Sequence, residues 1–403
     1  MGTNLTTVVG ALKRVYDKRA EYQQNLDHRS IDEISKSLEK YNAGGAGFYG
    51  AINDYGNESV GAINETEAFR TIDNENYAQW SVTPKVLVAP INVSGLVSKA
   101  ADSDEEAFVN AVVDALDRAK ERLLKDANRQ FFGLGNGLLA QAAGVVSSLA
   151  TSFAVDTAQY LRRNMVIDIF QGATKTVASI RVTDVDKVNG VVYLSGPVGQ
   201  ALTATSQLVK ERIRDSAAAD GKEAMGLRGI VDDATDLQTF QSLDASANRQ
   251  WRGRRIDAGG ANLTSDILQR LIDDVMVLSS EQTDLIIAHP KQRRKYLDLV
   301  VPQKRYMDQK MDSGFSKLSF NGLDFFLDID CQQDTIYALK KSYIRKFEVA
   351  PLEMGGLEGS DKFIRSAGTD TFEAYWRWYM NFGTSRRNAH GKIVGLASPT
   401  GVS

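Results

Sequence analysis

The chain has 403 residues, long enough for two domains or for one domain with extensions. Its composition, 43% hydrophobic and 25% charged, is ordinary for a soluble protein and argues against the membrane-spanning and disordered classes. The formal net charge of -3 lacks the basic excess that is typical of nucleic-acid-binding proteins, so we expect any contact with DNA to be loose or local.

The first hundred residues do not carry enough apolar side chains for a core of their own. Residues 8–24 have the spacing of a charged amphipathic helix, and Ile31, Ile34 and Leu38 repeat that spacing on a second short helix. Both apolar stripes are thin, so we expect them to dock on another subunit or domain. The basic residues that begin at Lys13 interrupt any secretory apolar run, which indicates a cytoplasmic protein.

Residues 41–67 are rich in Gly and Asn and contain three aromatic side chains, Phe48, Tyr49 and Tyr55. Such a segment is too flexible for a helix and too aromatic for a plain solvated linker. We therefore expect an outside surface to order it. The candidate contacts with a neighbouring subunit are Phe48, Tyr49 and Tyr55.

Residues 69–97 have an extended pattern and resemble the return strand of a long hairpin arm. The apolar side chains that share one parity are Trp80, Val82, Val86 and Val88. Two prolines, Pro84 and Pro90, exclude a central position in a sheet, because proline cannot donate to a strand ladder.

A long amphipathic helix is predicted from residue 103 to about residue 132. Ser103 and Glu106 fit a capping box, and acidic residues around them suit the positive end of the helix dipole. At 1.5 Å per residue this helix would be about 45 Å long, which suits a beam along a flat subunit. Its continuous apolar face consists of Phe108, Val112, Ala115, Leu116, Ala119, Leu123, Ala127 and Phe131.

A strand-rich stretch at about 153–210 predicts a small β-barrel or sandwich. Within it, residues 178–195 form a predicted hairpin in which Asn189 and Gly190 supply the positive φ angles of a type I′ turn. Residues 211–260 are polar and dotted with arginine, which is typical of loops.

An α/β layer is predicted next. A helix at 265–280 leads into a buried strand at 284–289, and Pro290 begins the following helix at a position that tolerates proline.

The strongest period-two alternation lies at residues 371–382. We predict that its apolar face packs on the long helix, the alternative being a strand buried in a separate sheet. That face consists of Phe372, Ala374, Trp376, Trp378, Met380 and Phe382, of which Trp376, Trp378 and Phe382 are the main candidates for the contact.

No constellation of residues predicts catalysis, a cofactor or a metal site. The three histidines are too few for a zinc cluster and have no cysteine pair to help them. The glycines at 133–137 lack the spacing of a phosphate-binding loop and favour a chain reversal instead. Residues 184–190 imitate a calcium loop but lack its ligands, so we interpret them as a hairpin. The single cysteine, Cys331, indicates a buried small side chain rather than a nucleophile.

Two basic clusters could contact phosphate, although such clusters more often belong to a solvated face or to ion pairs between subunits. The first surrounds Trp251 and includes Arg252 and Arg254; the second includes Arg293 and Arg294. These four arginines are the candidates for ion-pairing or DNA-facing positions.

Residues 286–306, 320–326 and 388–396 resemble the C-terminal half of tailed-bacteriophage major capsid proteins of the Hong Kong 97-like fold. The order of parts also resembles that family. The resemblance implies an α+β fold with an N-terminal arm (1–40), an extended hairpin loop (41–82), a peripheral domain with a spine helix (83–135) and an axial domain (136–334). The axial domain would include the β-rich insertion at about 153–210, and residues 335–403 would return to the peripheral domain.

The resemblance implies a subunit that forms hexamers and pentamers of an icosahedral head enclosing double-stranded DNA. Expected partners are further copies of the chain, a separate scaffolding protein, a portal and decoration proteins, with loose DNA contact and no membrane. The chain would be assembled in the bacterial cytoplasm and end in the virion. Two alternatives stay open: an encapsulin-type compartment, disfavoured by the long arm and insertion, and a soluble enzyme.

Overall fold

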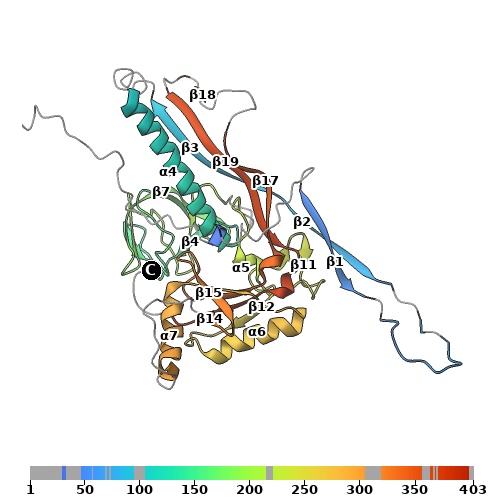
Figure 1. The fold of residues 1–403 in the computed structure, drawn as a ribbon. Coiled ribbons are helices and arrows are strands. Elements are labelled where there is room, and N and C mark those ends of the chain that lie inside the picture. The colour runs from blue at the N-terminus through green and yellow to red at the C-terminus, as the bar shows by residue number, and fades with distance from the viewer. Residues whose placement is uncertain are drawn as a thin grey trace, which may run out of the picture.

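The computed structural model describes residues 30–32, 47–56, 58–68, 70–71, 74–94, 105–214, 221–304, 319–355, 364–365, 368 and 371–398. The predicted helix at 8–24 lies outside these residues, as do Ile34 and Leu38 of the second predicted helix. The fold is α+β, as predicted, and Figure 1 shows a body from which one β-hairpin projects. Among the described helices, none has the length and apolar composition needed to cross a membrane.

The projecting hairpin consists of β1 (Phe48–Tyr55) and β2 (Asn76–Val82), paired antiparallel. Its base is fixed by the Trp80 ring, which lies over Gly50: a Cβ at Gly50 would stand 2.2 Å from a ring carbon. Only glycine leaves room for that close approach. Trp80 is 4% exposed and meets Phe347 at 5.7 Å between ring centroids, so the base of the hairpin joins the core of the body.

A four-stranded sheet and one long helix form the first layer of the body (Figure 1). The elements are β3 (Lys85–Ser94), β17 (Ile344–Met354), β18 (Ile364–Arg365), β19 (Thr371–Thr384) and α4 (Glu105–Phe131). Among the described strands, β3 pairs with β19 alone and is an edge strand, as predicted from Pro84 and Pro90. α4 covers much of the range predicted for the long helix.

The predicted shared parity across residues 80–88 is wrong. Trp80 and Val82 are buried, but Val86 and Val88 are exposed and Leu87 is buried in their place. The reason is that the segment contains two strands of different sheets, and the break between Val82 and Lys85 changes which parity faces the core.

The predicted packing of the strand at 371–382 on the long helix is confirmed. Trp376 Nε1 donates to the Leu116 carbonyl oxygen at 3.0 Å, and the Phe131 and Phe382 rings meet at 4.9 Å. Leu123 and Trp378 are 5% and 4% exposed in the same core. The side chains of Phe108 and Val112 lie outside the described residues.

A six-stranded β-barrel follows α4. Its strands are β4 (Leu138–Gln141), β5 (Ser152–Ala154), β6 (Val166–Gln171), β7 (Thr174–Asp186), β8 (Val191–Leu194) and β9 (Gln207–Lys210), in the order β4-β9-β6-β7-β8-β5. An isolated bridge between Ala142 and Val155 joins the two ends of this order and closes the barrel. The barrel was predicted at about 153–210 but begins at Leu138. Its first strand belongs to the uncharged stretch after α4.

The predicted hairpin between β7 and β8 is present, but its turn type is wrong. Asp186 pairs with Val191, which leaves a four-residue connection in which Gly190 has a positive φ of 65° and Asn189 does not. Asp186 Oδ1 accepts hydrogen bonds from the Val188 and Asn189 amides at 2.9 and 3.0 Å. This carboxylate stabilises a wider turn than the two-residue type I′ connection.

The second layer is a six-stranded sheet with two helices. The elements are β12 (Arg254–Asp257), β13 (Leu285–Ala288), β14 (Ser319–Phe320), β15 (Leu323–Leu327), β16 (Ile336–Leu339) and β20 (Gly391–Val394), with α6 (Ser265–Ser279) and α7 (Pro290–Lys304). Thr264 caps the N-terminus of α6, and its Oγ1 accepts from the Ile267 amide at 3.2 Å. The helices predicted at 265–280 and from Pro290, and the buried strand between them, are confirmed.

β13 is apolar throughout because this sheet is buried on both faces. Ile286 and Ala288 face the core under α6, whereas Leu285 and Ile287 belong to the core that α4 shares. The sheet also takes β16 and β20 from beyond residue 335. A domain boundary at 335 therefore does not follow the sheets, because the chain crosses between the two layers several times.

Short elements connect the layers. They are α5 (Leu227–Ile230), β10 (Thr239–Phe240), β11 (Leu243–Asp244) and the 3-10 turns Lys341–Tyr343 and Arg387–Ala389.

Candidate assembly surfaces

The hairpin arm exposes aromatic side chains along its strands. Tyr49, Tyr55 and Tyr77 are 61%, 53% and 62% exposed. Phe48, predicted as a contact with a neighbouring subunit, is 3% exposed and meets Phe347 at 5.1 Å within the same chain. That prediction is wrong for Phe48 because the residue lies at the base of the hairpin, where the strands enter the core. Tyr49 and Tyr55 are available to a partner.

The tip of the arm, between β1 and β2, narrows to a turn and is acidic. Ser59 Oγ donates to the Thr71 carbonyl oxygen at 2.8 Å, and the Glu67 amide donates to the Asn64 carbonyl oxygen at 3.0 Å. The described charged side chains between the two strands are Glu58, Glu65, Glu67, Arg70 and Glu75, all exposed. We call the segment 58–75 the acidic tip.

A basic groove lies between α4 and the barrel. It has a volume of about 760 Å³ and is lined by five cationic side chains and one carboxylate: Arg122, Arg162, Arg163, Arg181, Lys210 and Asp126. Asp126 is already paired, because Lys210 Nζ lies 2.8 Å and Arg129 Nε 3.2 Å from its carboxylate oxygens. Burial acts to raise the pKa of Asp126, but the two cations outweigh it and lower that pKa.

Sequence reasoning missed this groove, since its charges come from separate segments that only the fold brings together. The one available signal was the adjacent pair Arg162 and Arg163. The clusters that were predicted lie elsewhere. Arg254 pairs with Asp274 of α6 at 2.7 Å, and Arg252 Nε donates to the Ala245 carbonyl oxygen at 2.7 Å, so both make contacts within the chain.

Arg293 and Arg294, the other two predicted candidates, are exposed on α7. They belong to a helix far from the acidic tip in Figure 1. The structure thus separates the four candidate arginines into two partly buried ones with partners in the chain and two on a solvated helix face.

A buried polar junction joins the N-terminal segment to the body. Asp328 accepts from Ser30 Oγ at 2.5 Å and from the Ser30 amide at 3.2 Å, and Asn128 of α4 accepts from the Ile31 amide at 3.2 Å. Asn128 Nδ2 also donates to Asp330 at 2.7 Å. Residues 30–32 therefore dock on the body of their own chain, which fits the predicted alternative of another domain, and Ile31 joins the core there.

One of the two carboxylates at this junction, Asp330, is paired with Lys125, whose Nζ lies 2.7 Å from Asp330 Oδ2. Burial raises the pKa of Asp330, and Lys125 opposes that shift. The barrel contributes too: Tyr160 donates to the Asp330 carbonyl oxygen at 2.7 Å. The N-terminal segment, α4, the barrel and the second sheet thus meet at one hydrogen-bonded site.

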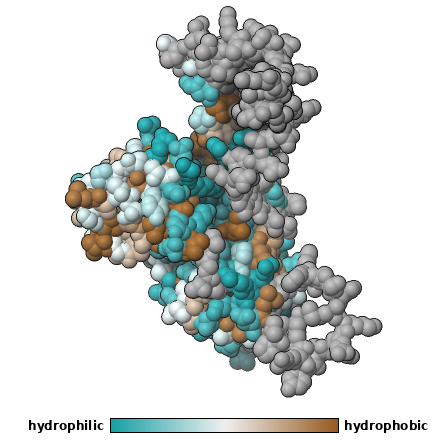
Figure 2. All heavy atoms as spheres, turned by 90° about the vertical axis from the view of Figure 1, so that its left-hand side faces the viewer, coloured by the Kyte–Doolittle hydropathy of each residue, from teal (hydrophilic) through white to brown (hydrophobic). Residues whose placement is uncertain are grey.

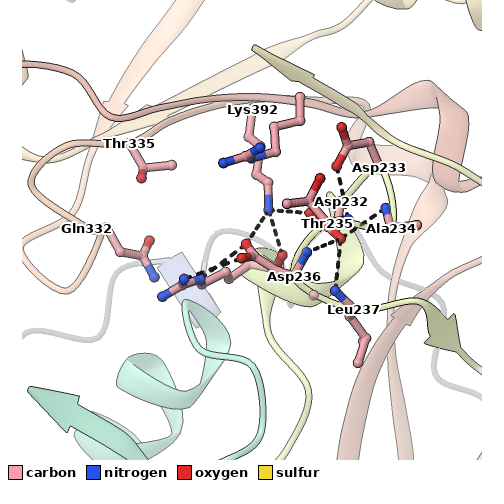
Figure 3. A network of polar contacts seen from close by, with 12 residues as sticks. Asp232, Asp233, Ala234, Thr235, Asp236, Leu237, Gln332, Thr335 and Lys392 are labelled. Atoms are coloured by element: carbon pink, nitrogen blue, oxygen red, sulfur yellow. Dashed lines mark hydrogen bonds and ion pairs between the residues drawn. The ribbon is translucent and has the colours of Figure 1, made fainter. Parts of the chain in front are cut away.

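A second buried network holds the loop after α5 against β20 (Figure 3). Lys392 is fully buried, and its Nζ lies 2.9 Å from Asp232 Oδ1 and 3.0 Å from Asp236 Oδ2. Asp232 Oδ2 accepts three backbone amides, from Ala234, Asp236 and Leu237, at 3.0–3.1 Å. This arrangement compensates each charge and is typical of a structural network.

Buried histidines belong to the scaffold as well. Burial lowers the pKa of His390 to about 3 and, with help from Lys291, that of His289 to about 4. His390 Nδ1 accepts from the Lys340 amide at 3.3 Å, which requires the neutral ring. In the described part of the chain, no three His, Cys, Asp or Glu side chains are placed to hold a metal ion.

Exposed apolar side chains are distributed rather than gathered. Figure 2 shows separate hydrophobic patches among hydrophilic side chains on one face of the molecule. The most exposed include Val60 on the acidic tip, Val145 and Leu149 on the barrel, and Val277 on α6, at 79–85%. Such patches are compatible with contacts between subunits.

Comparison with solved structures identifies the fold. The chain superposes on the capsid asymmetric unit of cyanophage A-1(L) with a TM-score of 0.63 and 10% identity, covering 98% of this chain and 100% of that one. The capsid of a native GTA particle gives a TM-score of 0.51 with 10% identity over 98% and 100%. No family model matches the sequence. No curated protein matches it either. The chain has the Hong Kong 97-like fold of phage capsid proteins.

Proposed function

We propose that this chain is the major capsid protein of a tailed phage, a non-catalytic subunit that assembles into hexamers and pentamers of an icosahedral head around double-stranded DNA. The observation that carries the proposal is the fold, which matches a cyanophage capsid protein over nearly the whole of both chains. The projecting hairpin adds support, because its exposed tyrosines do not contribute to the core of their own chain and would be buried only by a neighbouring subunit.

The fold elements suggest how the subunit is organised. α4 with the sheet of β3, β17, β18 and β19 corresponds to the peripheral domain with its spine helix, and the second sheet with α6 and α7 corresponds to the axial domain. The barrel is an insertion between them. Tyr49 and Tyr55 are proposed contacts of the extended loop with a neighbouring subunit.

The net charge of -3 fits a container that releases its contents, since strong phosphate binding would oppose both filling and ejection. The exposed Arg293 and Arg294 are the remaining candidates for loose contact with packaged DNA. We expect a scaffolding protein, a portal and decoration proteins as further partners, no membrane and no cofactor, with assembly in the bacterial cytoplasm and final location in the virion.

Electron microscopy of particles from cells that express the chain, with and without neighbouring head genes, tests the proposal. We expect closed shells whose absorbance ratio at 260 and 280 nm shows DNA only when packaging proteins are present. Shells of uniform size from the chain alone would contradict the expected scaffolding protein. Shells that hold a protein cargo instead would favour the encapsulin-type alternative, and a persistent monomer would refute both.

A further inference from the structure

We propose that the basic groove between α4 and the barrel is the docking site for the acidic tip of a second copy of this chain. The proposal rests on the proposed function and names the partner surface that the arm would occupy. Its basis is the charge and the placement of two surfaces of this molecule.

The described lining of the groove carries five cationic side chains and one carboxylate, which is a surplus of positive charge. Its carboxylate, Asp126, is held by Lys210 and Arg129, so it is not available to neutralise the guanidinium groups of Arg162, Arg163 and Arg181. Arg163 and Arg181 are exposed. Arginine presents its donors in a planar fork that matches carboxylates, which favours an acidic partner.

The acidic tip has the complementary charge and a shape suited to a groove. Four glutamates and one arginine are exposed on its described residues. Glu65 and Glu67 lie at the turn that ends it, where the Glu67 carboxylate accepts from the Asn64 amide at 3.1 Å. The Arg70 guanidinium lies against Gly61, where a Cβ would stand 2.4 Å from Arg70 Cζ, so the two sides of the tip lie close together. The result is a narrow projection with Glu65 and Glu67 at its turn and with Glu58 and Glu75 nearer the two strands.

The two surfaces lie on opposite sides of one chain. Figure 1 shows the hairpin on the right and the barrel beyond α4 on the left, with the body between them. An arm therefore cannot reach the groove of its own chain, and docking requires another copy. Contact between two different surfaces of identical chains is heterologous, and such contacts generate closed rings when the rotation between copies closes.

The barrel holds one side of the groove in a fixed position. Arg162 and Arg163 precede β6, and Arg181 lies on β7, both in a closed barrel with its own core. Arg181 Nη1 donates to Asn164 Oδ1 at 2.6 Å, which holds that guanidinium at the rim. Because both surfaces are solvated, the contact should weaken as salt shortens the Debye length from about 10 Å at 0.1 M to about 3 Å at 1 M.

Charge reversal of each surface tests the proposal in full-length chains. The tip variant carries Glu65→Lys and Glu67→Lys, and the groove variant carries Arg162→Glu and Arg163→Glu. Alone, each variant presents like charges on both surfaces and should lose at least tenfold in self-association by sedimentation velocity. When the two variants are mixed in equal amounts, the basic tip of the tip variant can pair with the acidic groove of the groove variant. The acidic tip of the groove variant can likewise pair with the basic groove of the tip variant, so association should return. A matched control, Arg249→Glu with Arg270→Glu, lies at exposed positions outside both surfaces and should associate as the wild type does.

Several outcomes would overturn the inference. Variants that associate normally alone, or that stay apart when mixed although tryptophan fluorescence shows both folded, would exclude the docking. A groove variant that associates normally but yields particles with less DNA would assign the groove to the packaged nucleic acid instead. A wild type that never associates would refute the proposed function itself, whereas wild-type shells insensitive to both reversals would refute only this inference.

Discussion

Replacing Lys392 by methionine should destabilise the folded chain strongly. The side chain is fully buried, and its Nζ contacts Asp232, Asp236 and the Arg228 carbonyl oxygen at 2.9–3.0 Å. Methionine fills a similar volume but removes the positive charge. Among the described residues, the change leaves Arg387, at 3.9 Å, as the one cation within ion-pair distance of the Asp232 carboxylate, and it leaves Oδ1 without Lys392 Nζ at 2.9 Å.

Removing one partner of a buried ion pair costs about 3–5 kcal/mol, because the remaining charge stays desolvated. The Arg228 carbonyl oxygen also loses its hydrogen bond to Lys392. We include that loss in the cost of about 3–5 kcal/mol, because the same ammonium group contacted both the carbonyl and the carboxylates. Against a total stability of about 5–15 kcal/mol, the loss is a large fraction. Urea unfolding of the unassembled chain, followed by tryptophan fluorescence, measures it through the midpoint and slope.

Two further variants make the Lys392→Met result interpretable. The double variant Lys392→Met with Asp232→Asn should lose less than Lys392→Met alone, because no uncompensated buried charge remains at Asp232. Arg293→Met, on the exposed face of α7, should change stability by no more than about 0.5 kcal/mol. A loss below about 1 kcal/mol for Lys392→Met, or a double variant less stable than the single one, would refute the buried ion-pair reasoning.

Three other changes test different parts of the molecule. Gly50→Ala should cost about 1–3 kcal/mol by displacing the Trp80 ring and should alter the near-ultraviolet circular dichroism, whereas Gly56→Ala, with open space around it, should do neither. His390 is neutral when folded, with a pKa near 3 against 6.5 when unfolded, so the unfolded chain takes up the proton first and stability falls as the pH drops below 6.5. At about pH 4.5 this amounts to about 2–3 kcal/mol, and His390→Gln should reduce the measured loss between pH 7 and 4.5 by that amount. Asp328→Ala should speed hydrogen exchange at the Ser30 amide, which loses its acceptor; unchanged protection there would contradict the anchoring of the N-terminal segment.

Periodicity predicted the elements whose packing is regular. The helices that became α4 and α6 show an apolar face with recognisable N-terminal residues, and β13 and β19 show the two strand patterns of double-sided and one-sided burial. In each case the local pattern reports directly on which side chains meet the core. The hairpin arm was also predicted, from the extended pattern at 69–97 and from the family resemblance.

The buried charges and the groove could not be predicted in this way. Lys392 and Asp232 belong to segments far apart in sequence, and a lysine in a strand reads as solvent-facing until a fold supplies its partner. Phe48 was misassigned for a related reason. It lies in a Gly-rich segment that looks free of the core, yet its pairing with Val82 carries it to the buried base of the hairpin.

The chain enters and leaves the barrel through one pair of neighbouring strands. β4 brings the chain in and β9 takes it out, and Leu138 is paired with Val209, so the two connections sit about 5 Å apart, one inter-strand spacing. A lobe joined at adjacent points can be shortened, enlarged or exchanged for another fold while the remaining layers keep their register. Closure of the sheet also leaves the barrel without an unpaired edge strand. The barrel can therefore lie beside many identical neighbours without forming intermolecular strand pairs.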